Sequence, residues 1–363
     1  MKVKIGDLTK IKTGKLDANA SSEDGQYPFF TCSREPLKIS TYSYDCECVL
    51  VSGNGDLNVK YYNGKFDAYQ RTYIIEDNGS GKLYMPYLYY FMEGYIEELR
   101  KQAIGGVIKY IKLGNLTNAM LELPSVDEQK SVVEILEKAE GILDKRSDEI
   151  NALDNLIKAR FVEMFGDPVC NPYGYDKVAL SDLADIRIGP FGLLLHKEDY
   201  IEGGHPLLNP SHIVDGKISP DDKLTISDEK YEELSAYQLK TGDVVMGRRG
   251  EMGRCAVVSE DGLLCGTGSM LIRTKGEVTA DYIQKIISFP SFKKTIEDMA
   301  VGQTMPNLNV PIVSGFQIIK PPMEVQDRYY AFVDQVDKSK VAVQKALDET
   351  QKLFDSLMQE YFN

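Results

Sequence analysis

Residues 244–255 read V-V-M-G-R-R-G-E-M-G-R-C, which places three arginines among three glycines. Glycine lets the backbone turn tightly, and arginine offers a planar set of donors suited to phosphates and base edges. The stretch fits a phosphate cradle, a nucleic-acid-reading finger, or an ordinary hairpin whose side chains only cap the turn. A nucleotide-hydrolysing phosphate loop needs G-x-x-x-x-G-K-[ST], which the sequence does not contain.

Other glycine-rich and asparagine-rich stretches also fall short of catalytic motifs. G-N-G-D-L-N (53–58) and G-T-G-S-M (266–270) indicate hairpins, because a dinucleotide fingerprint needs G-x-G-x-x-G at a strand-to-helix turn. N-P-Y-G (171–174) and N-P-S-H (209–212) resemble the N-P-P-[YF] motif of amino-methyltransferases only in part, since both lack its second proline. We therefore predict no catalytic residues in this chain.

The cysteines and histidines do not form a pattern typical of a metal or nucleophile site. The three histidines and six cysteines include no C-x-x-C pair, so neither a zinc site nor a Cys/His nucleophile is indicated. We interpret the cysteines as free, mostly buried thiols. The sequence predicts no metal site and no cofactor-binding site.

Length, charge and hydropathy limit the class of protein. The 363 residues suffice for two or three domains, and 42 basic against 55 acidic residues give a net charge of -13. This balance argues against indiscriminate nucleic-acid binding but allows a local basic face. The start M-K-V-K-I-G-D-L has no apolar signal-peptide core, and no apolar run reaches the about 18 residues of a membrane helix. We predict a cytoplasmic protein.

The first half of the chain is repeated in the second. I-G-D-L-T-K-I-K-T-G (5–14) matches L-S-D-L-A-D-I-R-I-G (180–189) at an offset of 175. V-L-V-S-G-N-G-D-L-N (49–58) then matches V-V-M-G-R-R-G-E-M-G (244–253) at an offset of 195. The second copy therefore carries about 20 more residues before its hairpin, and such repetition indicates two related domains.

The match continues to the end of the chain. Residues 106–116 match 303–313 at an offset of 197, and the same offset places Pro321 on Pro124 and Gln326 on Gln129. Each copy then ends in apolar residues spaced three and four apart, which predicts a long helix with a heptad seam. The first seam comprises Val132, Leu136, Ala139, Leu143, Ile150, Leu153, Ile157 and Met164. The second comprises Tyr329, Val333, Val336, Val343, Leu347, Phe354, Leu357 and Tyr361.

Two such helices in one chain are expected to pack on each other, because an isolated apolar stripe needs a partner. The predicted fold class is α+β, with two pseudo-repeated mixed α/β domains separated by two long helices packed as an antiparallel coiled coil. The predicted segments are 1–124, 125–168, 169–321 and 322–363. The alternative is that each helix is buried in its own domain. Residues 1–124 hold 15 basic and 15 acidic residues, so the excess of acid lies in the other three segments.

This organisation resembles the specificity subunit of type I restriction-modification systems. The resemblance covers the whole chain and rests on several motifs together. They are the openings K-I-G-D-L-T-K-I-K-T-G and V-A-L-S-D-L-A-D-I-R-I-G-P, the turn G-D-V-V-M-G-R-R-G-E-M-G-R-C, the closings L-E-L-P-S-V-D-E-Q-K and I-I-K-P-P-M-E-V-Q-D, and the junction F-V-E-M-F-G-D-P-V-C-N-P-Y-G-Y. It implies that 1–124 and 169–321 are target recognition domains and that 125–168 and 322–363 are the central and C-terminal conserved helices.

The resemblance also implies a mechanism and partners. Each recognition domain would read one half of a bipartite, asymmetric site in double-stranded DNA, and the helices would set the spacing and dock two methyltransferase subunits. Those subunits would recruit the restriction subunits, which translocate and cut DNA. S-adenosylmethionine, ATP and Mg are expected only in the partner subunits, so this chain itself would be no enzyme.

The DNA-reading residues are predicted on loops that can reach a groove, where arginine to guanine is the commonest specific contact. In the second domain the candidates are Arg248, Arg249, Arg254, Gln303, Thr304 and Asn307. In the first domain they are Ser52, Asn54, Asn58, Lys60, Gln70, Arg71 and Lys109. Any of them could instead only cap a tight hairpin.

Two other functions fit the same sequence. One is a non-catalytic coiled-coil scaffold or anti-restriction protein of the same fold that does not load onto DNA. The other is an enzyme whose site has no recognisable motif. Co-purification with methyltransferase subunits separates both from the DNA-specificity function.

Overall fold

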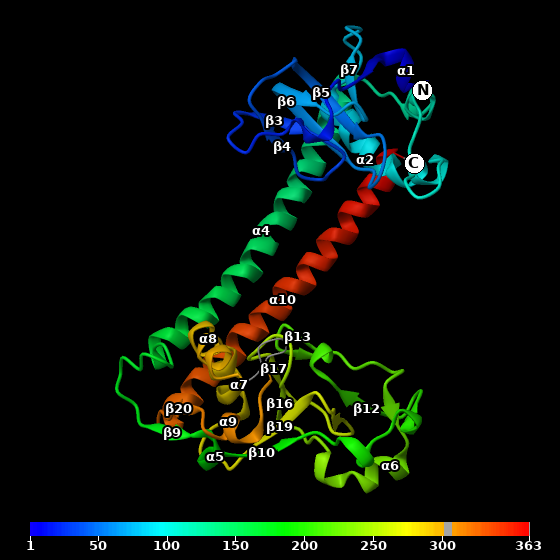
Figure 1. Cartoon of the computed structure of the whole chain (residues 1–363). Helices are drawn as coiled ribbons and strands as arrows, with labels where there is room; N and C mark the ends of the chain where they lie inside the picture. Colours follow the sequence, from blue (N-terminus) through cyan, green and yellow to red (C-terminus); the bar gives the residue numbers. More distant parts are fainter. Residues whose placement is uncertain (301–306, 363) are drawn as a thin grey trace. The chain divides into compact units, whose positions relative to one another are not determined.

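The computed structural model describes residues 1–300 and 307–362, and the chain folds as two compact units. Unit 1 comprises residues 1–151 with the C-terminal residues from Val341 onward, and unit 2 comprises residues 152–340. Two long helices, α4 (Val126–Phe165) and α10 (Met323–Phe362), each contribute to both units (Figure 1). Both lie within the segments predicted to be helical.

The globular part of unit 1 is a sheet with the strand order β2-β7-β5-β6-β3-β4. Its strands are β2 (Thr9–Thr13), β3 (Tyr27–Phe30), β4 (Leu37–Ile39), β5 (Tyr44–Ser52), β6 (Val59–Ala68) and β7 (Thr72–Asp77). A second pairing joins β1 (Lys2–Lys4) to β8 (Met120–Glu122). The helical segments are α1 (Ile5–Leu8), η1 (Ala18–Ala20), α2 (Met85–Gln102) and α3 (Leu113–Thr117).

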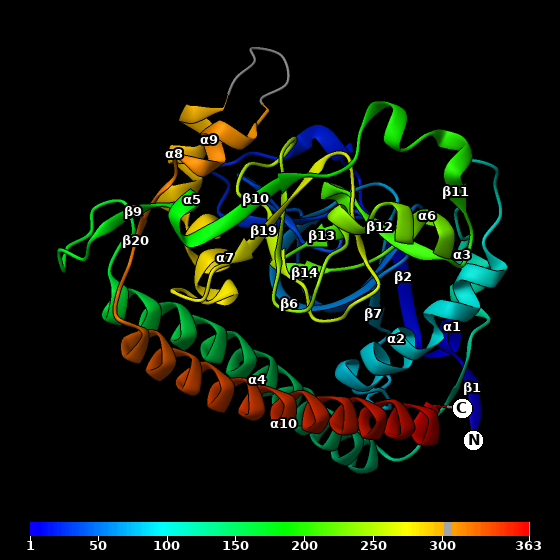
Figure 2. The same ribbon diagram turned by 90° about the horizontal axis from the view of Figure 1, so that it is seen from below.

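Unit 2 has two larger sheets, ordered β10-β19-β16-β17 and β11-β15-β12-β18, and the small pairs β13-β14 and β20-β9. The strands are β9 (Lys177–Ala179), β10 (Ala184–Ile188), β11 (Tyr200–Ile201), β12 (His205–Leu208), β13 (Ile213–Val214), β14 (Lys217–Ile218), β15 (Thr225–Ile226), β16 (Val244–Gly247), β17 (Cys255–Val257), β18 (Leu264–Cys265), β19 (Ser269–Thr274) and β20 (Gln317–Ile319). The helical segments are α5 (Leu180–Leu183), η2 (Gly192–Leu194), η3 (Lys197–Asp199), η4 (Pro210–His212), α6 (Asp228–Glu233), η5 (Ser235–Tyr237), α7 (Ala280–Ser288), α8 (Pro290–Met299) and α9 (Val310–Ser314). Helices α7 to α9 gather on one side of this unit, with β12 and α6 on the other (Figure 2).

The strand pairings confirm the predicted repeat. The antiparallel order β2-β7-β5-β6 in unit 1 recurs as β10-β19-β16-β17 in unit 2. Each unit also has one parallel pairing, β3 with β6 and β12 with β18, in which Phe30 pairs with Ala68 and Leu208 with Cys265. The two domains therefore share one fold core, although their loops differ in length.

The matched glycines at positions 14 and 189 serve the same close approach of two chain segments. Gly14 N donates to Thr72 O (3.0 Å), and Gly189 N donates to Ser269 O (3.1 Å). A Cβ on Gly14 would lie 2.1 Å from Ala68 O, and a Cβ on Gly189 would lie 2.0 Å from Gly266 O. Any larger residue at either position must displace the backbone opposite.

The match of Gln129 with Gln326 also has a structural cause, since each glutamine joins a long helix to its domain. Gln129 is fully buried; its Oε1 accepts from Tyr84 N (2.8 Å), and its Nε2 donates to Lys82 O (2.8 Å) and Pro124 O (3.0 Å). The amide N of Tyr84 precedes α2, whose first-turn N–H groups have no partner within the helix. The side chain therefore satisfies three backbone groups that no helix or strand pairing satisfies.

Gln326 makes the equivalent contacts in unit 2. It is fully buried, its Oε1 accepts from Thr279 N (3.3 Å) at the start of α7, and its Nε2 donates to Pro321 O (3.0 Å). In unit 1 the start of α4 is also held by a capping box, because Ser125 N donates to Glu128 Oε2 (2.8 Å) and Glu128 N donates to Ser125 Oγ (3.3 Å).

Within each unit, one part of α4 shares a hydrophobic core with the opposite part of α10. In unit 1, Val133 and Leu136 belong to the same core as Phe354 and Leu357. In unit 2, the end of α4 lies against the start of α10, where Tyr329 Oη donates to Ile157 O (3.4 Å). The start of each helix thus meets the end of the other, which is the predicted antiparallel pairing.

Among residues 1–300 and 307–362, no helix combines the length and the apolar character that crossing a bilayer requires.

Replacing Gln326 with leucine should lower the free energy of unfolding by about 1–3 kcal/mol, because Thr279 N and Pro321 O lose their buried partner. Urea unfolding of the full chain measures the change. Gln335→Leu is the matched control: Gln335 is exposed on α10, and a change within about 0.5 kcal/mol is expected there. Equal effects of the two substitutions would contradict the proposed anchoring role.

Gly189→Ala should destabilise the chain by about 1–3 kcal/mol, because the added methyl group meets the Gly266 carbonyl. Gly141→Ala should do the opposite. Gly141 lies inside α4 with no atom within 4 Å of an added Cβ, so alanine should stabilise by about 0.5–1 kcal/mol. Thermal unfolding of the two variants, compared with the unaltered chain, checks both signs.

Candidate nucleic-acid interface

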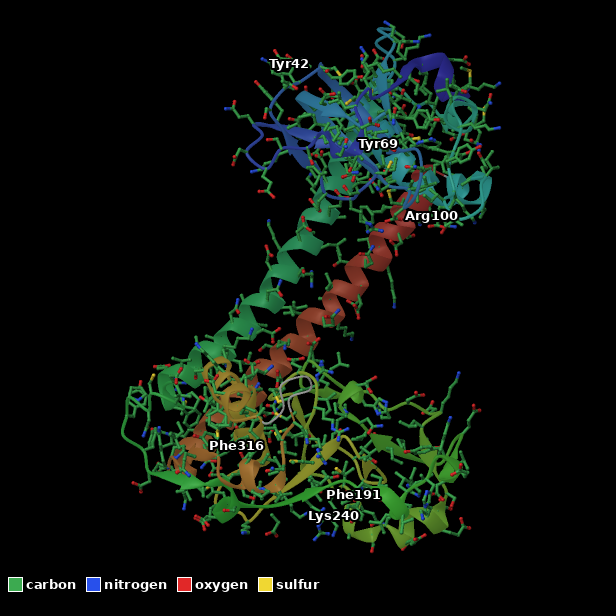
Figure 3. All side chains as sticks on the ribbon, viewed as in Figure 1. Tyr42, Tyr69, Arg100, Phe191, Lys240 and Phe316 are labelled. Atoms are coloured by element: carbon green, nitrogen blue, oxygen red, sulfur yellow. The ribbon has the colours of Figure 1, made fainter. Side chains whose placement is uncertain are left out.

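In unit 1, loops at one end of the sheet hydrogen bond to each other through their backbones. The hairpin after β5 begins at Gly53, whose N donates to Arg71 O (2.8 Å) in the turn between β6 and β7. Gly53 O accepts from Ile111 N (2.9 Å) in the loop that follows α2. Tyr69, labelled in Figure 3, begins the same turn, and its N donates to Phe30 O (2.9 Å) at the end of β3.

We call these three backbone hydrogen bonds the loop frame, and unit 2 has the same three bonds. Arg248 N donates to Gly268 O (3.0 Å), Leu308 N donates to Arg248 O (2.9 Å), and Gly266 N donates to Leu208 O (3.0 Å). The bridge between Arg249 and Asn307 corresponds to that between Asn54 and Tyr110. Arg248 thus stands where unit 1 has Gly53, and Arg249 where it has Asn54, as the offset of 195 predicts.

The next position of the hairpin explains why both copies have glycine there. Gly55 has φ +71° and Gly250 has φ +79°, a left-handed conformation that disfavours a side chain. Each glycine precedes an acidic residue and then a buried apolar one, Leu57 or Met252. The hairpin is therefore fixed by its glycine, its buried side chain and its backbone bonds, so the residue just before the glycine, Asn54 or Arg249, is free to differ.

The predicted residues of unit 1 fall into four groups on this end of the sheet. Arg71 and Lys109 are exposed, and their side chains make no hydrogen bond or ion pair with the described residues. Gln70 is exposed but donates to Asp17 Oδ1 (2.8 Å). Ser52 is only 2% exposed, and its hydroxyl faces Cys32 O (3.5 Å), so its position is that of a loop support.

Asn54, Asn58 and Lys60 form the edge of the hairpin. Asn54 Oδ1 accepts from Cys32 Sγ (2.9 Å), and Asn58 Nδ2 donates to Cys32 O (3.0 Å). Lys60 Nζ donates to Asn58 Oδ1, and burial lowers the pKa of this lysine. Some of the hydrogen-bonding groups of these side chains are therefore already used within unit 1.

The arginines of unit 2 differ in how far they are available. Arg249 is exposed at the hairpin turn, whereas Arg248 is half-buried and donates from Nε to Asn307 Oδ1 (3.0 Å). Burial, followed by the charge of Arg249, lowers the pKa of Arg248. Arg254 turns away from the tip: it pairs with Glu251 (2.8 Å) and donates to Pro210 O (3.1 Å). The predicted residues Gln303 and Thr304 lie outside the described residues.

Sequence reasoning missed one loop in each unit. Residues 31–35 follow β3 and supply Cys32 O, to which both Ser52 and Asn58 bond. Residues 209–212 follow β12 and supply Pro210 O for Arg254. The sequence does show a similarity between these loops. Two apolar residues followed by a polar one stand at 29–31 (F-F-T) and at 207–209 (L-L-N), at an offset of 178, which lies between the offsets of 175 and 195.

The arrangement suits recognition. In each unit, loops held together by backbone hydrogen bonds carry polar and basic side chains. Such side chains hydrogen bond with base edges and phosphates.

Comparison with known proteins decides the family. The model of the family described as type I restriction modification DNA specificity domain matches residues 1–153 and 172–351. The chain belongs to this family. The match covers both units, in agreement with the repeat of the loop frame.

Two relatives and two solved structures illustrate the likeness. The type I restriction enzyme EcoDI specificity subunit of Escherichia coli is 38% identical over 156 residues, which are 43% of this chain and 34% of that protein. The MjaVIII specificity subunit of Methanocaldococcus jannaschii is 19% identical over 386 aligned positions, covering 98% of this chain and 90% of that one. This chain thus spans about a third of the length of the first relative.

The solved structures share the fold. The crystal structure of the type I restriction-modification S subunit from M. genitalium has a TM-score of 0.59 at 16% identity, covering 100% of this chain and 96% of that chain. A chain from work on complex assembly and conformational transition of the type I R-M system has a TM-score of 0.66 at 16% identity, covering 100% and 97%.

Family membership confirms the predicted class of function. The matched model describes a DNA specificity domain, and both relatives are named as specificity subunits of type I restriction enzymes. The alternative of a scaffold that does not load onto DNA is not favoured.

Proposed function

We propose that each domain of this chain reads one half of a bipartite, asymmetric DNA site, while α4 and α10 set the spacing of the halves. The observation that carries this proposal is the shared loop frame with different side chains. Gly53 and Asn54 occupy the same backbone positions as Arg248 and Arg249, held by the same hydrogen bonds. Two readers of different sequences require a constant scaffold with variable polar side chains.

The proposal assigns the readers as follows. Arg249 lies at the tip and reaches base edges, while Arg248, braced by Asn307, presents its terminal guanidinium nitrogens beside it. In unit 1, Asn54 and Asn58 contact bases, and Arg71 and Lys109 contact bases or phosphates. The remaining predicted residues, Ser52, Lys60, Gln70, Arg254 and Asn307, hold or flank these readers, and Gln303 and Thr304 stay candidate readers from the sequence.

The helices dock two methyltransferase subunits in this proposal, and restriction subunits join through them. S-adenosylmethionine, ATP and Mg are bound by those partners and not by this chain. The net charge of -13 fits such an assembly, because partners then supply much of the phosphate contact that DNA binding requires. The complex works in the cytoplasm, where the DNA is.

Co-expression with its methyltransferase subunits tests the proposal. The full chain should co-purify with two copies of the methyltransferase, and sequencing of methylated DNA should show one bipartite asymmetric site with a fixed spacer. A host expressing the methyltransferase alone is the control. If the chain forms no such complex and no bipartite site is methylated, the proposed function is wrong.

Arg248→Ala should weaken binding of the complex to its cognate site by about 1–3 kcal/mol, because the guanidinium contacts a base edge. Titration of labelled cognate and scrambled duplexes measures this. An equal loss on both duplexes makes Arg248 a phosphate contact, and no loss contradicts the assignment. Lys240→Ala is the control, since Lys240 is exposed before β16 whereas Arg248 follows that strand.

Asn54→Ala and Arg249→Ala should relax specificity in different half-sites. The two residues hold equivalent positions in the two units, so each substitution should broaden the methylated sequence on one side of the spacer only. Methylated-site sequencing of each variant reads out both halves at once. Broadening of the same half by both variants would contradict the assignment of one half-site to each unit.

A further inference from the structure

A cavity of about 330 Å³ lies beside the recognition hairpin of unit 2. Its walls are the return arm of the hairpin at 253–255, the loop 213–216, and the side chains of Gln284, Lys285, Ser288 and Lys293 from α7 and α8. It opens next to Arg254, which the loop frame turns away from the hairpin tip. None of the groups assigned to base reading lines it.

Cationic side chains surround this cavity. Glu251 pairs with Arg254 (2.8 Å) and with Lys293 (2.9 Å), so one carboxylate holds two cations in place. Lys285 is half-buried on the same wall and has no ion pair with the described residues. Both lysines act on the buried Cys255 thiol: burial raises its pKa to about 12, and Lys293 and Lys285 oppose that rise. Both lysines also line the cavity.

The charges nearly balance, with one positive charge in excess. Arg254, Lys285 and Lys293 stand against Glu251 and Asp215, the carboxylates among the lining residues. A phosphodiester carries one negative charge and accepts several hydrogen bonds, which the two lysines and the Gln284 amide can donate, whereas the Ser288 hydroxyl donates to Gln284 O (2.7 Å). Ion pairs as exposed as these add little to folding stability, so the fold alone does not account for this cluster.

The equivalent cavity of unit 1 serves as an internal comparison. It measures about 360 Å³ and lies between the hairpin at 57–59 and α2. Asp56 again pairs with two cations, Arg34 (3.2 Å) and Arg100 (3.3 Å), the latter labelled in Figure 3.

The other positions have changed, however. Because α2 starts at Met85 and α7 at Ala280, the offset of 195 puts Tyr90 in place of Lys285 and Glu93 in place of Ser288. Glu97 also pairs with Arg100. Unit 1 thus lacks the unpaired lysine. Its cavity is lined by Arg34, Arg100 and Glu93, and Asp56 and Glu97 pair with the two arginines, so three carboxylates surround two cations and an anion is less favoured than in unit 2.

We propose that the cavity of unit 2, with Lys285 and Lys293 as its donors, binds a phosphate of the DNA backbone and so fixes how the recognition hairpin approaches its half-site. The proposal rests on the DNA-reading function proposed above and adds to it. It makes the two units unequal: unit 2 is anchored on the backbone beside its hairpin, whereas unit 1 is not. Arg254 belongs to this anchor as a positioning residue that holds Glu251.

The salt dependence of DNA binding tests the proposal. The complex of the full chain with its methyltransferase subunits is titrated with cognate and scrambled duplexes at several KCl concentrations. Each of Lys285→Gln and Lys293→Gln should reduce the slope of log K against log salt by up to about one, with equal loss on both duplexes. Lys294→Gln, the exposed neighbour on α8, and Arg100→Gln in unit 1 should leave the slope unchanged.

Three outcomes would overturn the proposal. An unchanged slope for both lysine variants removes the phosphate contact, and a lower urea midpoint with that unchanged slope makes the lysines structural. Loss confined to the cognate duplex makes them base readers. If inorganic phosphate raises the melting temperature of the unaltered protein but of neither lysine variant, while the DNA slope is the same in all, the cavity takes the free anion and not DNA.

Failure of the proposed function is a separate result. It appears when the unaltered complex binds cognate and scrambled duplexes equally. Even then, the slopes on the scrambled duplex still decide whether Lys285 and Lys293 contact a phosphate.

Discussion

A single buried glutamine at the start of each long helix couples the helix to its domain. Gln129 and Gln326 each accept from a backbone N–H at the beginning of the domain helix and donate to the carbonyl of a proline before the long helix. An unmet polar group in these positions would cost more than an ordinary hydrogen bond contributes, because water cannot reach it. The glutamine therefore fixes the direction in which α4 and α10 leave their domains. The apolar seam of each helix can be buried only once this direction is set.

The recognition loops follow a different principle, in which the backbone carries the structure. Hydrogen bonds from Gly53 and Arg248 to the neighbouring turn and closing loop are all between main-chain atoms. Such bonds do not depend on the side chains, so an exposed residue at the same position can change from asparagine to arginine without loss of the fold. Positions where the fold requires a certain type of residue have that type in both units. They are a glycine with positive φ, an acidic residue and a buried apolar side chain.

A chain with a negative net charge can bind DNA only where its basic side chains are clustered on part of its surface. In unit 2 the carboxylate of Glu251 does not cancel a basic face but holds Arg254 and Lys293 around a cavity. In unit 1 the equivalent carboxylate is Asp56, which also pairs with two cations. The cavity beside it contains a further carboxyl group, Glu93, whose pKa is raised by burial and by Glu140. The two units share one backbone arrangement but differ in local charge because a few helix residues differ. Unit 1 has Tyr90 and Glu93 on α2 where unit 2 has Lys285 and Ser288 on α7.

The repeat, the two long helices, their antiparallel pairing and the family could all be predicted from the amino-acid sequence. These features follow from local periodicity and from motifs in a common order, and Gly14, Gly189, Gln129 and Gln326 were all visible as matches. Only the tertiary structure decided which side chains are available. Ser52 is buried, Arg254 turns toward Pro210, and the loops at 31–35 and 209–212 support the hairpins. Those outcomes depend on strand register and on contacts between residues such as Cys32 and Asn58 or Arg248 and Asn307. Such contacts join segments distant along the chain, and the direction of a side chain is set by what the fold brings beside it.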